Sequence, residues 1–84
     1  MNIHRAYAPW AIRRHELLGD LFLSRCAQNG VTPPPVLWMT SDDGTETKCL
    51  ILWSDEDADL VEGSVGELPW LVFNAVQERS VDRN

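Results

Sequence analysis

The stretch VLWMTSDDGTETKCLILW, residues 36–53, decides the fold of this chain. Two runs rich in apolar and β-branched residues, 36–40 and 45–53, flank the dipeptide Asp43-Gly44. Asp-Gly between two such runs is a strong hairpin signal, because both residues accept the backbone angles of a tight turn. The sequence therefore predicts an antiparallel β-hairpin with its turn near Gly44.

The register of this hairpin depends on the length of its turn. A two-residue turn places Trp38 opposite Cys49 and Val36 opposite Ile51, whereas a three-residue loop shifts the pairing by one residue. The sequence leaves both registers open. In either one, the two faces of the hairpin are apolar away from the turn, so we expect cover on both faces or a partner chain on one.

Upstream of the hairpin, the sequence predicts an amphipathic helix over residues 9–28. Pro9 suits the first turn of a helix, and Asn29-Gly30 supplies the residues that end one. Three prolines follow and prevent the helix from continuing. The apolar stripe recurs at spacings of three, four and seven, at Trp10, Leu17, Leu18, Leu21, Phe22 and Cys26.

Downstream of the hairpin, Ser54 and the acids after it match a helix start, since Ser caps a helix and acids favour its first turn. We predict a short helix over residues 55–62 that ends at Gly63. The segment 69–79 is ambiguous between a helix and a third strand, and we predict a helix. Residues 80–84 are expected to be a frayed tail. The result is a small single α+β domain, residues 1–84, with the order α-β-β-α.

Composition limits the class of protein. The chain has 84 residues, 44% of them apolar, and a net charge of −6, so we expect a folded acidic domain. It shows no secretory signal and no apolar run near the roughly 20 residues of a membrane span, which predicts a soluble cytoplasmic protein without a membrane partner. Cys26 and Cys49 are expected to be buried free thiols, with a disulfide as the alternative.

The charge is unevenly distributed along the chain. Residues 41–67 hold nine acidic side chains against one base, Lys48, a net charge of −8, whereas residues 1–30 carry +2. Such asymmetry indicates one face of negative potential that attracts a basic partner. It argues against direct binding of nucleic acid by the molecule as a whole.

The sequence carries no catalytic or metal-binding motif. Asp55, Asp57 and Asp59 resemble the opening of a calcium loop, but the glycine and the bidentate glutamate that such a loop requires are missing. His4 and His15 are not at metal-ligand spacing and have no nucleophile elbow nearby. A domain this small is also expected to lack room for a cleft. We therefore predict no enzyme activity, no cofactor and no metal.

The leading hypothesis is a small acidic inhibitor that occludes a basic, nucleic-acid-binding surface of a larger protein. Phage-encoded inhibitors of bacterial defence complexes, including anti-CRISPR proteins, act in this way, and the analogy is one of size and charge. The residues predicted to contact the partner are Asp42, Asp43, Glu46, Asp55, Glu56, Asp57, Asp59, Glu62, Trp38 and Trp53.

Two alternatives come from other classes. In the first, the apolar hairpin and the tryptophans form an obligate interface of a structural or assembly subunit, most simply a homodimer. In the second, the basic first helix makes an antitoxin-like regulator that contacts nucleic acid, with Arg14 and Arg25 on one helix face among the arginines Arg5, Arg13, Arg14 and Arg25.

Overall fold

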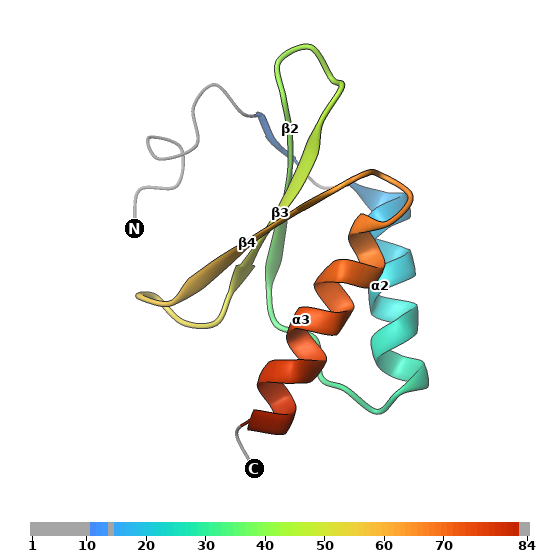
Figure 1. Cartoon of the computed structure of the whole chain (residues 1–84), viewed down its shortest axis with the longest axis vertical. Coiled ribbons are helices and arrows are strands. Elements are labelled where there is room, and N and C mark those ends of the chain that lie inside the picture. The colour runs from blue at the N-terminus through green and yellow to red at the C-terminus, as the bar shows by residue number, and fades with distance from the viewer. Residues whose placement is uncertain (1–10, 14, 83–84) are drawn as a thin grey trace.

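The computed structural model describes residues 11–13 and 15–82 of the chain. It is an α+β domain, as predicted, with a four-stranded antiparallel sheet in the order β1-β2-β3-β4 and both helices on one face of it (Figure 1). The elements are β1 (Ala11–Arg13), α2 (Glu16–Gln28), β2 (Val36–Thr40), β3 (Thr47–Leu52), β4 (Ala58–Gly63) and α3 (Leu68–Asp82).

The predicted hairpin is confirmed as β2 and β3. Trp38 lies opposite Cys49, which is the register of the two-residue turn. The ladder stops earlier than predicted, so the loop is longer than two residues. The backbone N–H of Gly44 donates to the carbonyl of Ser41 at 2.9 Å, and Gly44 has a φ of +75°. This left-handed conformation is open to glycine at little cost, which explains why Gly44 sits there.

The first helix begins later than the sequence predicted. Residues 11–13 form strand β1, paired with β2 through Ile12 opposite Met39, and Pro9 and Trp10 lie outside the described residues. The reason is that strand pairing satisfies the backbone groups of this segment along β2. The N-cap of α2 is His15, whose Nδ1 accepts the backbone N–H of Leu18 at 3.4 Å.

The buried side of α2 is narrower than the predicted stripe. Leu18, Phe22 and Cys26 are buried, whereas Leu17 is 62% exposed and Leu21 is 38% exposed. A single row of residues three to four apart is enough here, because α2 contacts the rest of the core along one line.

The predicted short helix over residues 55–62 is wrong, since residues 55–57 lie in a turn and β4 begins at Ala58. The backbone N–H groups of Trp53 and Ser54 both donate to the carbonyl of Asp57, at 2.9 and 3.1 Å. These bonds close a turn that sends Ala58 back along β3. The acids after Ser54 thus occupy a strand-connecting turn, a role that the same residue types fill as readily as a helix start.

The predicted C-terminal helix is confirmed as α3, and it is longer than expected. It runs to Asp82, so residues 80–82 are not a frayed tail, and residues 83–84 lie outside the described part. Leu68, Val72 and Val76 face the sheet and are at most 1% exposed. Neither helix of the described chain is long and apolar enough to cross a bilayer.

One core fills the space between the helices and the sheet. Phe22 of α2 meets Trp38 of β2 edge to face, with ring centroids 6.3 Å apart. Cys26 and Cys49 are buried free thiols, and burial raises the pKa of Cys49 to about 12. They act as small apolar side chains, as predicted.

The opposite face of the sheet is also apolar. By strand alternation it carries Met39 and Leu50, both buried, together with Leu37, Leu52 and Leu60, and Leu60 is 39% exposed. Among the described residues, no helix lies over this face (Figure 1). The helices therefore supply the expected cover on one face, and the described residues place no helix on the other.

Candidate acidic binding site

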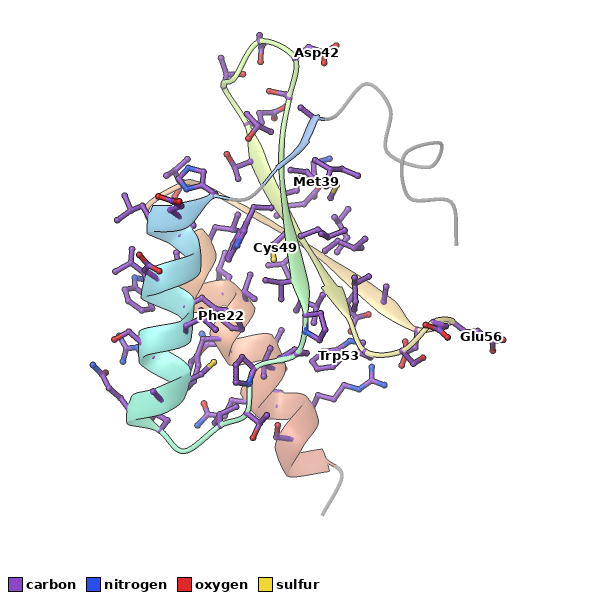
Figure 2. The ribbon with its side chains drawn as sticks, turned by 180° about the vertical axis from the view of Figure 1, so that it is seen from behind. Phe22, Met39, Asp42, Cys49, Trp53 and Glu56 are labelled. Atoms are coloured by element: carbon purple, nitrogen blue, oxygen red, sulfur yellow. The ribbon has the colours of Figure 1, made fainter. Side chains whose placement is uncertain are left out.

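The acidic residues fall into two groups at opposite ends of the sheet. One group lies in the hairpin tip, residues 41–46, and the other in the acidic turn, residues 53–57. Successive connections of an antiparallel meander alternate between its two ends, and the labelled Asp42 and Glu56 lie far apart (Figure 2). The six residues of β3 separate the groups by about 20 Å at roughly 3.3 Å per residue. The two groups therefore do not form one compact cluster.

In the hairpin tip, Asp43 serves the turn itself. Its Oδ1 accepts hydrogen bonds from the hydroxyls of Ser41 and Thr45, each at 2.7 Å, and from the backbone N–H of Thr45 at 3.0 Å. These bonds, led by the one from Ser41, lower the pKa of Asp43 to about 2. Asp43 is thus ionised at neutral pH, and its carboxylate serves the structure of the loop.

Asp42 and Glu46 are the two other acids of the hairpin tip. Both are exposed. The backbone N–H of Glu46 donates to the Ser41 hydroxyl at 3.1 Å, which holds the backbone of Glu46 while its carboxylate remains on the surface. The two carboxylates are available to a partner.

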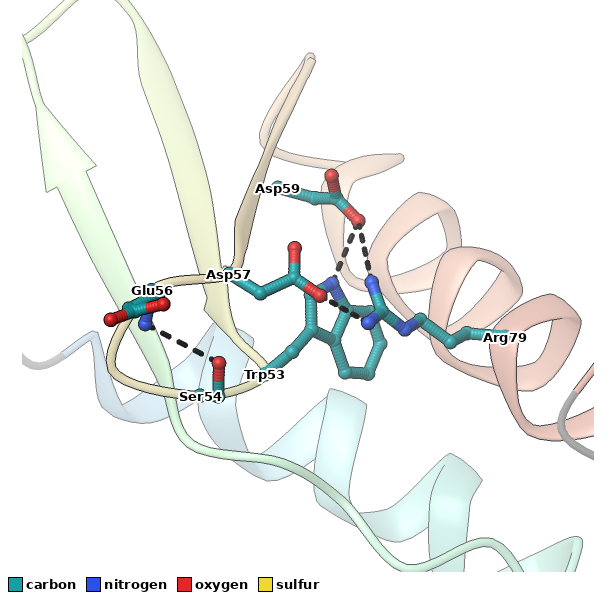
Figure 3. Close-up of polar contacts among 6 residues, drawn as sticks. All are labelled: Trp53, Ser54, Glu56, Asp57, Asp59 and Arg79. Atoms are coloured by element: carbon teal, nitrogen blue, oxygen red, sulfur yellow. Dashed lines mark hydrogen bonds and ion pairs between the residues drawn. The ribbon is translucent and has the colours of Figure 1, made fainter.

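In the acidic turn, Asp55 and Glu56 are exposed at the corner of the molecule. The hydroxyl of Ser54 accepts the backbone N–H of Glu56 at 3.3 Å (Figure 3), so it stabilises a turn in place of the predicted helix start. This bond stabilises the turn and leaves the Asp55 and Glu56 carboxylates in solvent. They form the second available pair.

Asp57 and Asp59 lie beside a cation that the sequence did not point to. The guanidinium of Arg79, from α3, pairs with Asp57 and lies 3.8 Å from Asp59. It also lies over the ring of Trp53, 4.5 Å from the centroid, and Trp53 Nε1 donates to Asp59 at 2.7 Å (Figure 3). Asp57, Asp59 and Trp53 therefore stabilise the junction of β4 and α3.

Arg79 is 22 residues from Asp57 in the sequence. No local spacing links two residues so far apart. The one available signal is that Arg79 is the only base of the predicted C-terminal helix, in a chain with few bases.

Two more of the predicted contact residues have internal partners. Glu62 on β4 pairs with Lys48 on β3 at 2.8 Å across the strand pair. Trp38 is only 4% exposed and packs in the core, so it offers a partner almost no surface. Trp53 is half-buried beneath Arg79.

The available charge therefore belongs to a subset of the predicted residues. Among the predicted contact residues, four acids have neither an ion pair nor a side-chain hydrogen bond with another described residue. They are Asp42, Glu46, Asp55 and Glu56. Such a set can bind cationic side chains at separate points, at the two ends of the sheet.

The basic first helix of the antitoxin-like alternative does not form as predicted. Helix α2 begins at Glu16, and Arg25 is the only arginine within it. Arg25 instead stacks over Trp70 of α3, 4.4 Å from the ring centroid. Arg5 and Arg14 lie outside the described residues.

The chain was compared with protein-family models, with curated proteins and with solved structures. No family model, curated protein or solved structure matches this chain.

Proposed function

We propose that this protein is a non-enzymatic acidic inhibitor that occludes a basic, nucleic-acid-binding surface of a larger protein in the cytoplasm. The observation that carries the proposal is the presence of unpaired acids at both ends of the sheet, Asp42 and Glu46 at one end and Asp55 and Glu56 at the other. Their carboxylates are free for a partner, whereas those of Asp57, Asp59 and Glu62 already have cations.

The spacing of the two groups suits a surface built for nucleic acid. A strand of duplex DNA carries one phosphate per roughly 3.4 Å of helix axis, so about 20 Å corresponds to about six phosphates. Cationic residues that contact phosphates several nucleotides apart would meet the hairpin tip and the acidic turn together. The phage anti-defence class, which includes anti-CRISPR proteins, fits this mode of action by analogy of size and charge.

The test compares two triple variants that change the net charge equally. The first, Asp42→Asn, Asp55→Asn and Glu56→Gln, removes charge from the two groups. The second, Glu16→Gln, Asp20→Asn and Glu78→Gln, removes charge from the helices. Each variant removes three negative charges, so the two variants have the same net charge.

The partner is first captured from the native host lysate, and its binding to nucleic acid is then measured with each protein as competitor. Wild-type protein and the helix variant should inhibit that binding, while the first variant should be weaker by roughly 10- to 100-fold, from about 0.5–1 kcal/mol per lost charge contact. Equal inhibition by all three proteins would refute charge-based occlusion. A captured protein whose nucleic-acid binding is unaffected would refute the function itself.

The second candidate, an assembly subunit, is favoured by a different observation. The face opposite the helices carries Leu37, Leu52 and the 39% exposed Leu60 around the buried Met39 and Leu50, and apolar faces of this kind often mark interfaces.

Light scattering separates the two candidates. A homodimer that persists in high salt and dissociates on Leu60→Lys would support the assembly role. A monomer at all salt concentrations would exclude a homodimer through this face.

A further inference from the structure

A cavity of about 510 Å³ lies between α2 and the start of β2. It corrects the expectation that so small a domain has no room for a cleft. Strand β1 pairs with β2 only from Trp38 onward, so the edge of β2 at Val36 and Leu37 has no strand beside it. The prolines before β2 and the side of α2 around Gly19 complete the walls. The volume is within the range of small-molecule pockets.

The walls of the cavity are largely apolar. Phe22, Leu23 and Leu37 line it together with Pro35 and Trp38. Leu23 is 50% exposed, so its side chain is accessible to an apolar ligand in the cavity. The cavity is therefore suited to the hydrocarbon part of a ligand.

One donor in the cavity wall has no hydrogen-bond partner among the described residues. Trp38 is only 4% exposed, but its indole nitrogen is not a buried atom without a partner, so the N–H keeps access to solvent. Its Nε1 faces Gly19, where an added Cβ would lie 3.6 Å away, and both residues line the cavity. A tryptophan that is largely buried normally places its N–H against an acceptor. A ligand oxygen in the cavity would supply one.

The rim of the cavity is acidic. Glu16 and Asp20, one turn apart on α2, border it together with His15, whose Nδ1 is used by the helix cap. No lysine or arginine is among the lining residues that the structure describes. The rim therefore favours a cationic group on the same ligand.

We propose that this cavity binds a small amphipathic amine, of the chemical class of an aromatic amino-acid amide. The ring fills the apolar space beside Phe22, a carbonyl oxygen accepts the Trp38 indole N–H, and the ammonium group faces Glu16 and Asp20. This site is separate from the hairpin tip and the acidic turn, and it does not depend on the proposed inhibitor function.

The test is an NMR titration of the full chain with L-phenylalaninamide as the probe. The indole N–H resonance of Trp38 is identified by its loss in Trp38→Phe. It should shift saturably, with a Kd in the roughly millimolar range expected for a fragment of this size. The absence of a saturable Trp38 shift, or a larger shift of the Trp53 or Trp70 indole, would overturn the proposal.

Two matched leucine variants test the position of the site. Leu23→Trp places a ring at the wall and should weaken binding at least tenfold, while Leu17→Trp adds the same ring on the same helix outside the cavity and should leave the Kd unchanged. Equal affinity of both variants would overturn the site.

A pair of probes tests the acidic rim in wild-type protein, so the result does not depend on any variant folding. N-acetylphenylalaninamide keeps the ring and the carbonyl but lacks the ammonium group. It should bind at least threefold more weakly than L-phenylalaninamide, whereas equal binding would overturn the role of Glu16 and Asp20.

Discussion

Replacing Arg79 tests how the acidic turn is held against α3. Arg79→Met removes the guanidinium and keeps a side chain of similar length. The loss comprises a stacking contact on Trp53, about 0.5–1 kcal/mol at an exposed site, and ion pairs with Asp57 and Asp59 worth about 0.2–1 kcal/mol each. The side chains of Arg79, Asp57 and Asp59 are 37%, 46% and 57% exposed, so solvent screening places both pairs in the lower half of that range.

The expected total is a loss of about 1–2 kcal/mol in the free energy of unfolding, measured by urea denaturation. In an 84-residue domain this corresponds to a fall in Tm of roughly 5–15 °C. Glu78→Gln, at the neighbouring exposed position of α3, is the control and should change the free energy by less than about 0.5 kcal/mol.

Salt separates the two kinds of contact in the Arg79 cluster. At 1 M salt the Debye length is about 3 Å, so the ion pairs with Asp57 and Asp59 weaken while the stacking on Trp53 remains. The deficit of Arg79→Met should then shrink by about half, given the magnitudes above. A variant as stable as the wild type in low salt would refute this account of the junction.

Three further predictions concern the hairpin tip and the core. Gly44→Ala should lower the free energy of unfolding by about 1–2 kcal/mol, because its φ of +75° is strained for alanine, whereas Gly66→Ala, where an added Cβ meets nothing within 4 Å, should cost less than about 0.5 kcal/mol. NMR should show the Asp43 carboxyl titrating near pH 2. Because folding lowers this pKa, the contribution of Asp43 to stability is complete above the ordinary pKa of 3.8 and is lost as the pH falls toward 2. A midpoint near 3.8 would contradict the hydrogen bonds in the loop. Leu18→Ala should cost about 2–5 kcal/mol and Leu17→Ala under about 0.5 kcal/mol by urea denaturation, since these neighbours are 1% and 62% exposed; equal losses would contradict the orientation of α2.

The sequence predicted the hairpin well because its signals are local. Asp43-Gly44 and the two apolar runs around it lie within 18 residues, and their pairing needs no information from the rest of the chain. For α3 the local signals were divided, because Pro69 and the polar end of the segment favoured a helix whereas Val72 and Val76 favoured a strand. In the hairpin, local chemistry and the final fold agree.

Strand β4 was missed because its residues do not alternate between apolar and polar. Asp59 and Val61 share the face toward the helices, while Leu60 and Glu62 share the other. Ser54 and the acids after it match a helix start equally well, and pairing with β3 overrides that local preference. Whether this segment forms a helix or a strand is therefore decided by the position of β3.

The candidate site was predicted in part. The acidic character of both turns follows from composition, but the division between available and paired acids depends on Arg79 and Lys48, which reach their partners through the tertiary fold. The buried position of Trp38 depends in the same way on the packing of Phe22. Residue type alone cannot distinguish such a tryptophan from an interface anchor.

Mapping the interface of the captured complex by NMR tests the central claim most directly. On addition of the partner, the backbone amide signals of residues 41–46 and 53–57 should shift or broaden first, and these changes should weaken steeply with added salt. If the changes fall instead on Leu37, Leu50 and Leu60 of the apolar face and persist in high salt, the acidic turns do not carry the binding and the proposed function is wrong.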